Sequence, residues 1–379
     1  MSVTAAPSTS RRPLPAMLIA GVIGLVLGYA VLEAVNAGIA LVWEDIPASW
    51  ATTPAWYVIG VLLLAAVLVY VVRRFVGDTG HSPIGGIKVS GLTPRDYVGA
   101  ILAILASLWG GVVLGPEVAL VATGSMIGTV TAKGMKFTDP AAEKKIVGFG
   151  ALGAILALFV GPILSGNMQL GSTPTAIELA QLAWAIPIAI VASVAVTLSR
   201  LLAAVLARAA GQGPHLVILI AAALVVAVTA LILQAWTGAS VLFVVTSGEE
   251  MISELPTLTT ASTVVAILVL KSIAYAVSLG AGYRGGPFFP AMFVGAASGL
   301  LVAMLIPNGP SASAALIVGV VAAVVATSPM KWVLVIVLGA VIGLLMGTWT
   351  LVPAAVLGAV VARVIPRWGD RIIVPAHSG

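Results

Sequence analysis

The feature that most constrains this chain is a series of apolar segments that follow one another along almost its whole length. They cover about residues 14–42, 55–72, 97–115, 117–132, 146–170, 179–207, 215–236, 261–280, 288–306, 313–327, 331–350 and 352–365. Only 8% of the residues are charged, whereas soluble domains contain about 25%. So few charges cannot cover a soluble surface, and the sequence therefore predicts an all-α polytopic membrane protein.

Several of these apolar segments are shorter than the ~20 residues that a helix needs to cross a bilayer. Helices that stop partway leave irregular backbone at membrane depth, which is tolerated only where protein or water covers it. The segment lengths therefore predict discontinuous helices around a cavity inside the membrane.

Lys and Arg in short loops mark the cytoplasmic face of a membrane protein. Here they cluster at residues 73–95, 133–145 and 363–371. We therefore expect a multi-pass protein of the cell membrane with both termini in the cytoplasm, where residues 1–13 and 367–379 form tails. The net charge of +5 has the same explanation, and we expect no nucleic-acid partner.

The chain contains no cysteine and three histidines, His81, His215 and His377. A zinc site would have to be assembled from residues far apart in sequence, so we expect neither a metal nor a cofactor. None of the histidines lies in the middle of an apolar run. This argues against a membrane-embedded hydrolase with a Ser–His or metal centre, and we expect that the protein is not an enzyme.

One motif occurs twice. Residues 111–117 (GVVLGPE) and 282–288 (GYRGGPF) each place a Gly-Pro pair directly before an apolar segment rich in small residues, and the same shift aligns Gly124 with Gly295. The pattern predicts an internal duplication, with a first membrane repeat at 14–210 and a second at 211–366. Repeated halves with interrupted helices are typical of transporters, whose binding site lies between the halves near the middle of the membrane.

The two Gly-Pro pairs predict helix starts near Pro116 and Pro287, because proline is favoured at the first helical position. A helix start presents free N–H groups and a partial positive charge. Two helix starts that meet inside the membrane would form an anion site without Lys or Arg, and dipoles release a small anion more readily than a full charge does.

Glu117 lies in the first turn of one of these predicted helices. Its carboxylate would be stabilised by the helix dipole and would occupy the place that an anion favours. A carboxylate inside a membrane is costly, which makes Glu117 a functional candidate. The alternative is a helix-capping carboxylate in a polar crevice.

At these residues the chain resembles the chloride channel (CLC) family of anion channels and proton-coupled antiporters. Residues 110–119 stand where the family has Gly-(Lys/Arg)-Glu-Gly-Pro, and residues 286–290 (GPFFP) fit its signature Gly-x-Phe-x-Pro. Residues 80–84 resemble a third signature, Gly-Ser-Gly-Ile-Pro, and residues 247–250 resemble a short motif between the family's halves. The resemblance covers about residues 14–366. It implies an inverted-repeat, chloride-channel-like fold and a homodimer with a separate pathway in each protomer, in a short, divergent bacterial-type member without a C-terminal regulatory domain.

The resemblance also implies roles for individual residues. Glu117 would be the gating glutamate that competes with the anion. Backbone N–H groups of Phe288 and Phe289 would contact the anion, and Ser82 would donate its hydroxyl. The expected anion-binding residues are Ser82, Gly115, Pro116, Val118, Gly286, Phe288 and Phe289.

Two departures from the family bear on the mode of transport. The family's inner tyrosine has no counterpart, because Tyr283 is the last tyrosine, and no carboxylate follows Pro162 before Glu178, where the antiporters carry a proton-relaying glutamate. We therefore expect passive transport of a small inorganic anion, chloride by default, gated by voltage or pH through Glu117. The alternatives are a proton-coupled anion antiporter and a cation-coupled solute transporter that uses Glu33, Glu117 and Glu178.

Other polar residues have less specific interpretations. Lys271 is interpreted as a helix-end lysine that snorkels to the interface, rather than as a counter-charge for the anion. Glu33 is either a pathway residue or a protonated glutamate that faces the helix bundle. We expect Glu249, Glu250 and Glu254 on an aqueous loop or vestibule, and most Trp and Tyr residues at the membrane interfaces.

Overall fold

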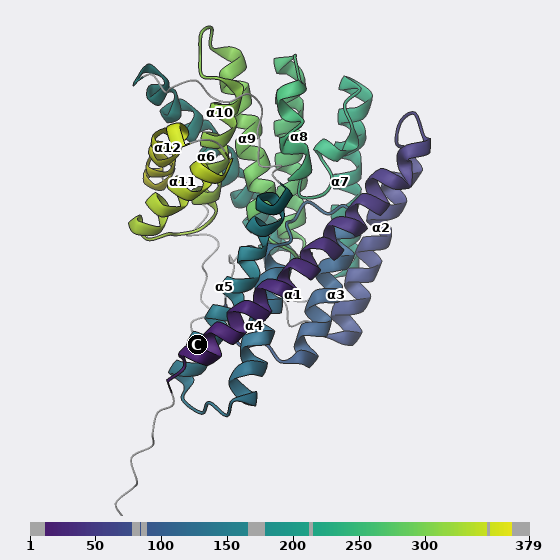
Figure 1. The fold of residues 1–379 in the computed structure, drawn as a ribbon. Helices are drawn as coiled ribbons and strands as arrows, with labels where there is room; N and C mark the ends of the chain where they lie inside the picture. Colours follow the sequence, from purple (N-terminus) through teal and green to yellow (C-terminus); the bar gives the residue numbers. More distant parts are fainter. Residues whose placement is uncertain are drawn as a thin grey trace, which may run out of the picture.

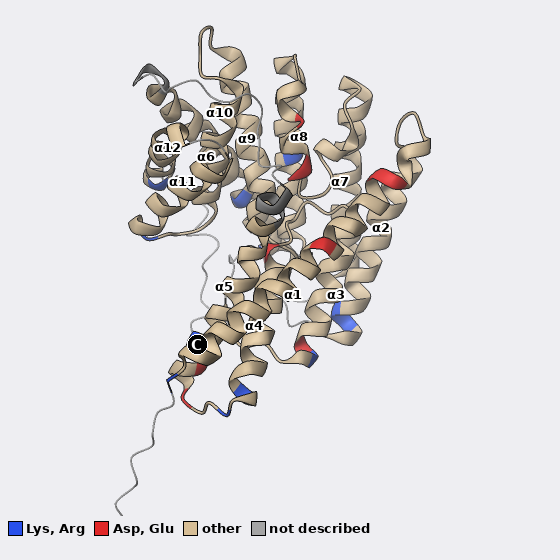
Figure 2. Cartoon of the chain, viewed as in Figure 1, with Lys and Arg blue, Asp and Glu red and all other residues tan. Residues whose placement is uncertain are grey.

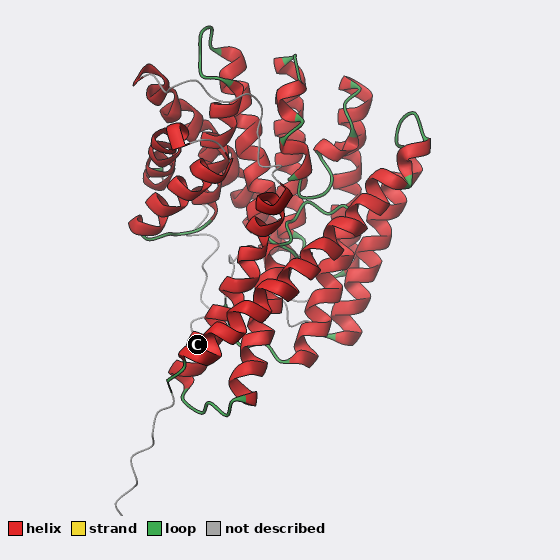
Figure 3. Cartoon of the chain, viewed as in Figure 1, coloured by secondary structure: helices red, strands yellow, loops and turns green. Residues whose placement is uncertain are grey.

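The computed structural model describes residues 12–77, 84, 89–165, 179–211, 215–346 and 349–365, without the side chains of 161–165 and 179–181. The described part of the chain is helical and contains no strand (Figure 3). Its α-helices, shown in Figure 1, are α1 Leu14–Ala40, α2 Ala55–Val71, α3 Pro94–Trp109, α4 Glu117–Gly134, α5 Pro140–Ser165, α6 Leu179–Ala210, α7 Leu216–Thr237, α8 Ala261–Gly280, α9 Phe288–Leu305, α10 Ala312–Thr327, α11 Trp332–Met346 and α12 Val352–Val364. The predicted all-α fold is confirmed.

Short π-helical and 3-10 turns extend or connect these helices. They are η1 Leu41–Asp45, η2 Pro47–Ser49, η3 Val72–Val76, η5 Val241–Phe243, η6 Glu250–Ile252, η7 Leu255–Thr257 and η8 Trp349–Leu351. Three of them, η5 to η7, lie in the segment between α7 and α8. This segment is the longest described connection without an α-helix, and it borders the candidate site described below.

Within the described ranges, six helical segments are long and apolar enough to cross a membrane, and the apolar helices at 312–327, 332–346 and 349–364 are shorter. This mixture of lengths agrees with the discontinuous helices expected from the sequence. Charged residues are sparse over the whole ribbon and gather at the turn between α4 and α5 (Figure 2). That turn includes Lys133 and Lys136, which the sequence predicts to be cytoplasmic.

The repeated glycines allow helices to pack closely in both halves. Gly124 of α4 lies against the backbone of Gly150 in α5, and Gly295 of α9 lies against the backbone of Gly319 in α10. A Cβ atom at either position would clash with the facing carbonyl oxygen. Close approach of backbones through small residues is the usual way in which membrane helices associate.

Replacing Gly295 with alanine (G295A) should therefore destabilise the fold by about 1–3 kcal/mol, because α9 and α10 would have to separate. Gly60 is a matched control, since it also lies inside a helix but has nothing within 4 Å of an added Cβ atom. There G60A should be neutral or stabilising by up to about 1 kcal/mol. Thermal unfolding of both variants in detergent compares them, and equal midpoints would contradict the packing role.

The structure leaves the repeat boundaries as predictions. The expected repeats at 14–210 and 211–366 share internal features, which are described below, but no observation locates the boundary itself. Most of the expected tails at 1–13 and 367–379 lies outside the described residues.

Candidate functional site

The two repeated motifs meet in the middle of the protein. The N–H of Gly115 donates to the carbonyl oxygen of Gly286 (2.8 Å), and the N–H of Gly286 donates to the carbonyl oxygen of Gly115 (2.7 Å). Gly115 and Gly286 thus form an isolated antiparallel β-bridge. From this junction α4 extends to the lower part of the view and α9 to the upper part (Figure 1). The N-termini of the two helices therefore face each other, as the sequence predicts.

Each helix begins directly after its proline, which agrees with the expected start near Pro116 and Pro287. Pro116 and Pro287 are N-cap residues, and the first helical residues are Glu117 and Phe288. Proline has no backbone N–H, but at the N-cap position this removes no donor from the site. The free N–H donors begin at the residues that follow the two prolines.

Glu117 lies at this junction and is 3% exposed. Its Oε1 atom accepts a hydrogen bond from the N–H of Phe288 (2.5 Å), and the N–H groups of Phe289 and of Glu117 itself also act on the carboxyl group. Its Oε2 atom is buried and has no hydrogen-bond partner among the described residues. The carboxyl group of one half therefore lies at the N-terminal start of the helix in the other half, where free N–H groups and the helix dipole favour a negative charge.

The glycines predicted to bind the anion lie against the same carboxyl group. A Cβ atom on Gly115 would clash with Oε2 of Glu117, and one on Gly286 would clash with its Cδ and Oε1 atoms. These glycines therefore provide the space that the carboxyl group now fills. Pro116 is buried and Val118 is partly buried. Ser82, His81 and Glu178 lie outside the described residues.

Two serines that sequence reasoning missed connect the halves symmetrically. Ser107 of α3 accepts a hydrogen bond from the N–H of Arg284 (3.2 Å), and Ser278 of α8 accepts one from the N–H of Val113 (3.1 Å). Both pairs of residues correspond at the shift that aligns the two motifs. Each serine thus holds the loop before the helix start of the other half. The shift that aligns the two motifs also pairs Ser107 with Ser278, so the sequence repeat alone could have identified these two serines.

Tyr275 is a second site residue that the sequence did not reveal. Its hydroxyl donates to the carbonyl oxygen of Pro287 (2.8 Å), directly before α9. Tyr283 is also fully buried and donates to the carbonyl oxygen of Leu219 (2.7 Å). The expectation that tyrosines anchor the interface is therefore wrong for these two, because each supplies a buried carbonyl with a donor.

Replacing Tyr275 with phenylalanine (Y275F) should leave the Pro287 carbonyl without its donor, at a cost of about 1–3 kcal/mol. Because this carbonyl lies next to Phe288, we expect the apparent affinity for the anion to change together with stability. The matched variant Y283F removes an equally buried bond away from the helix start, and should lower stability alone. Flux against anion concentration and thermal unfolding separate the two effects. The same affinity in both variants would contradict a role for Tyr275 in the site.

Lys271 lies inside α8 and has no exposed surface. Its Nζ atom donates to the carbonyl oxygens of Val244 (3.0 Å), Val245 (3.1 Å) and Thr246 (3.0 Å), and it lies 4.9 Å from the centre of the Phe293 ring. The snorkelling interpretation is therefore wrong. All three ammonium donors are used to hold the segment between α7 and α8.

Glu33 is not directed into the helix bundle. Its side chain is exposed on α1 and interacts with Tyr29, one turn earlier on the same helix. Of the two alternatives for Glu33, the bundle-facing glutamate is therefore wrong.

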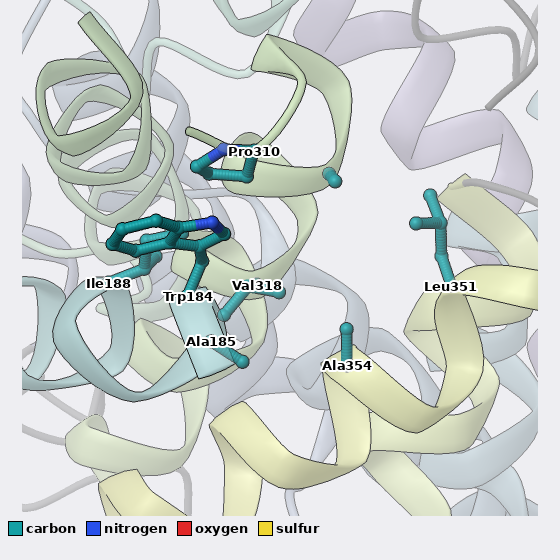
Figure 4. A pocket seen from close by; sticks show the side chains of 8 residues that line it. Trp184, Ala185, Ile188, Pro310, Val318, Leu351 and Ala354 are labelled. Carbon is teal, nitrogen blue, oxygen red and sulfur yellow. The ribbon is translucent and has the colours of Figure 1, made fainter. Parts of the chain in front are cut away.

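A separate apolar pocket lies between α6, α10 and α12 (Figure 4). Trp184 and Ile188 of α6, Val318 of α10 and Ala354 of α12 line it. It contains none of the predicted site residues and has no charged lining group, so it offers an anion no charged partner.

Comparison with known proteins gives one family match. The family described as voltage gated chloride channel matches residues 151–367, more than half of the chain. The match contains the second motif but not Glu117. No curated protein matches the sequence.

Several solved structures share the fold. A slow cyanobacterial Cl⁻/H⁺ antiporter has a TM-score of 0.70 and 19% identity, and the match covers 94% of both chains. A CLC-type fluoride/proton antiporter has a TM-score of 0.69 and 14% identity, over 93% of this chain and 95% of that one. A eukaryotic CLC transporter has a TM-score of 0.62 and 15% identity, over 95% of this chain and 73% of that one. At these identities the likeness establishes the fold alone.

Proposed function

Because the chain belongs to the voltage gated chloride channel family, we propose that it transports a small inorganic anion, chloride by default, across the cell membrane. The anion would pass between the N-termini of α4 and α9. The observation that carries this proposal is the hydrogen bond from the N–H of Phe288 to Oε1 of Glu117 (2.5 Å). A carboxylate oxygen there stands in for an anion, because the same donors and the same dipole would stabilise either one.

Glu117 and the anion would compete for this position. When the carboxylate is charged, it is held by charge-assisted hydrogen bonding and blocks the pathway. When it is protonated, it loses that advantage and leaves the N–H groups to the anion. Transport gated in this way depends on pH, and Glu117 is the group through which protons act.

Two modes of transport would use this site. Passive flux needs only the gate, and it agrees with the lack of a carboxylate between Pro162 and Glu178. Proton-coupled antiport needs a proton route to Glu117 as well. It is at least as well supported, because two structures of the same fold are described as a Cl⁻/H⁺ antiporter and a fluoride/proton antiporter.

The remaining expectations belong to this proposal. By family resemblance we propose a homodimer with a pathway in each protomer, termini in the cytoplasm and Ser82 as the inner anion ligand. The backbone donors would be at Phe288 and Phe289, next to Gly286. Gly115, Pro116 and Val118 would shape the opposite helix start.

Anion efflux from proteoliposomes tests the function. Vesicles loaded with chloride, with a potassium ionophore to set the voltage, would be followed by a chloride electrode and a pH electrode together. Chloride release without proton movement indicates passive transport, and release with a fixed proton ratio indicates antiport. If chloride, nitrate and fluoride are all retained, the anion function is wrong and the cation-coupled solute transporter takes its place.

A further inference from the structure

Arg73 follows the end of α2 that the sequence predicts to be cytoplasmic, yet its side chain is directed into the protein. It belongs to the π-helical turn η3, as does Arg74. Arg74 is exposed, and its guanidinium group lies 5.9 Å from the centre of the Phe75 ring. Arg73 is only 7% exposed. A basic side chain near the end of a membrane helix usually reaches toward water, so the inward direction of Arg73 requires a partner inside the protein.

That partner is the carbonyl group of Gly282. The Nη1 atom of Arg73 donates to the carbonyl oxygen of Gly282 (2.6 Å), which is the first residue of the loop 282–287 before α9. Gly282 has a φ of +93°, a conformation that favours glycine. A Cβ atom at this position would lie 2.9 Å from Nη1 of Arg73. The glycine therefore leaves the space that the guanidinium group occupies.

The corresponding carbonyl group in the first half has a different donor. Gly111 aligns with Gly282 at the shift of the internal repeat, and it also has a positive φ, of +80°. Its carbonyl oxygen accepts the N–H of Thr246 (3.0 Å), which is a neutral backbone group. A hydrogen bond from a charged donor is shorter and stronger than one from a neutral donor. The charged anchor is therefore specific to the half that supplies the N–H of Phe288.

Hydrogen bonds to other elements fix the loop 282–287 along its length. The partners are Arg73 at Gly282, Leu219 at Tyr283, Ser107 at Arg284, Gly115 at Gly286 and Tyr275 at Pro287. Of these partners Arg73 is the one that contributes a charged side chain. The N–H of Phe288 follows this loop directly, so the anchors of the loop set the direction of that N–H. Donors held in place before an anion arrives bind it more tightly than donors that must first be ordered.

We propose that Arg73 is a positioning residue for the anion site. By binding the carbonyl group of Gly282 it holds the loop that directs the N–H of Phe288, and so it sets how tightly the start of α9 binds a negative group. Arg73 acts through the loop and does not itself contact the anion. This inference rests on the proposed anion transport, and it names a residue that determines the affinity of the same site.

The test measures flux from proteoliposomes against chloride concentration in an E117Q background, where no carboxylate competes with the anion. Replacing Arg73 with methionine (R73M) should raise the concentration for half-maximal flux about tenfold, because a hydrogen bond from a charged donor is lost. The matched control is R74M, which removes the same charge from the neighbouring, exposed residue and should leave this concentration unchanged. The half-maximal concentration does not depend on the fraction of protein that folds, so it can be measured even if R73M folds less efficiently.

Two further comparisons distinguish positioning from a general structural effect. Lysine at position 73 (R73K) keeps a charged donor, so its half-maximal concentration should lie between those of R73M and the unsubstituted residue. With Glu117 present, R73M should cause a smaller shift than in E117Q. The reason is that the carboxylate and the anion share the N–H of Phe288, and R73M would weaken the binding of both.

Three results would overturn the positioning role. The first is an equal half-maximal concentration in R73M and R74M. The second is a loss of maximal flux in R73M without a change in that concentration, because Arg73 would then only support the fold. The third is a shift in R73K as large as that in R73M. If neither the unmodified protein nor E117Q passes any anion, the proposed function itself is wrong and this inference fails with it.

Discussion

Replacing Glu117 with glutamine (E117Q) is expected to raise anion flux about tenfold at alkaline pH and to remove most of its pH dependence. The charged carboxylate accepts the N–H of Phe288. A hydrogen bond to a charged group is worth about 1.5–3 kcal/mol and a neutral one about 0.5–1.5 kcal/mol. The difference of about 1.4 kcal/mol corresponds to a factor of ten in occupancy of the site. Glutamine retains the shape of the side chain, so the effect would report the charge.

Flux into or out of proteoliposomes as a function of pH is the measurement for this prediction. Glu143 provides the control, because it lies in the first turn of α5, at the distant turn between α4 and α5. There E143Q should leave both rate and pH profile unchanged. If E117Q shows the same profile as the unmodified protein at every pH, Glu117 is a helix-capping carboxylate and the gate lies elsewhere.

Replacing Lys271 with methionine (K271M) is expected to cause the largest loss of stability of any substitution considered. The ammonium group is the common donor to the carbonyl oxygens of Val244, Val245 and Thr246. Each buried carbonyl left without a partner costs about 1–3 kcal/mol. Removing the buried charge recovers part of this cost. The net loss should exceed about 3 kcal/mol, because three acceptors lose their donor at once.

Thermal unfolding in detergent, followed by tryptophan fluorescence, measures this loss. Lys331 is the control, because its side chain is exposed before α11 and K331M removes a charge without exposing a buried carbonyl. We expect K271M to unfold several degrees below K331M. Equal unfolding midpoints would show that the three bonds contribute little net stability.

The local sequence pattern was sufficient to predict the helices and the place where the starts of α4 and α9 meet. The apolar runs predicted both ends of each helix from α1 to α12 within six residues, because burial in a bilayer depends on the hydrophobicity of each segment by itself. The Gly-Pro pairs predicted the starts of α4 and α9, since proline limits where a helix can begin. Glu117 was found by the same reasoning, because a carboxylate in an apolar sequence is conspicuous.

Side-chain partners could not be predicted in this way. The sequence predicts an interface position for Lys271 and for most tyrosines, although Lys271 and Tyr275 are fully buried. Their partners are backbone carbonyls of other segments, and a carbonyl gives no signal in a sequence because every residue has one. Ser107 and Ser278 are intermediate cases. Their positions follow from the internal repeat, but their function required the crossed hydrogen bonds to be seen.

By itself the sequence therefore determined an all-helical membrane protein with two related halves, whose Gly-Pro motifs begin helices near a single buried glutamate. Hydropathy and backbone restriction act locally, so they are visible in a linear chain. Only the tertiary structure decided that Glu117 of one half accepts the N–H of Phe288 in the other, and that Lys271 holds the acidic segment beside it. These contacts join residues that are distant in sequence, and only the packing of the helices brings them together.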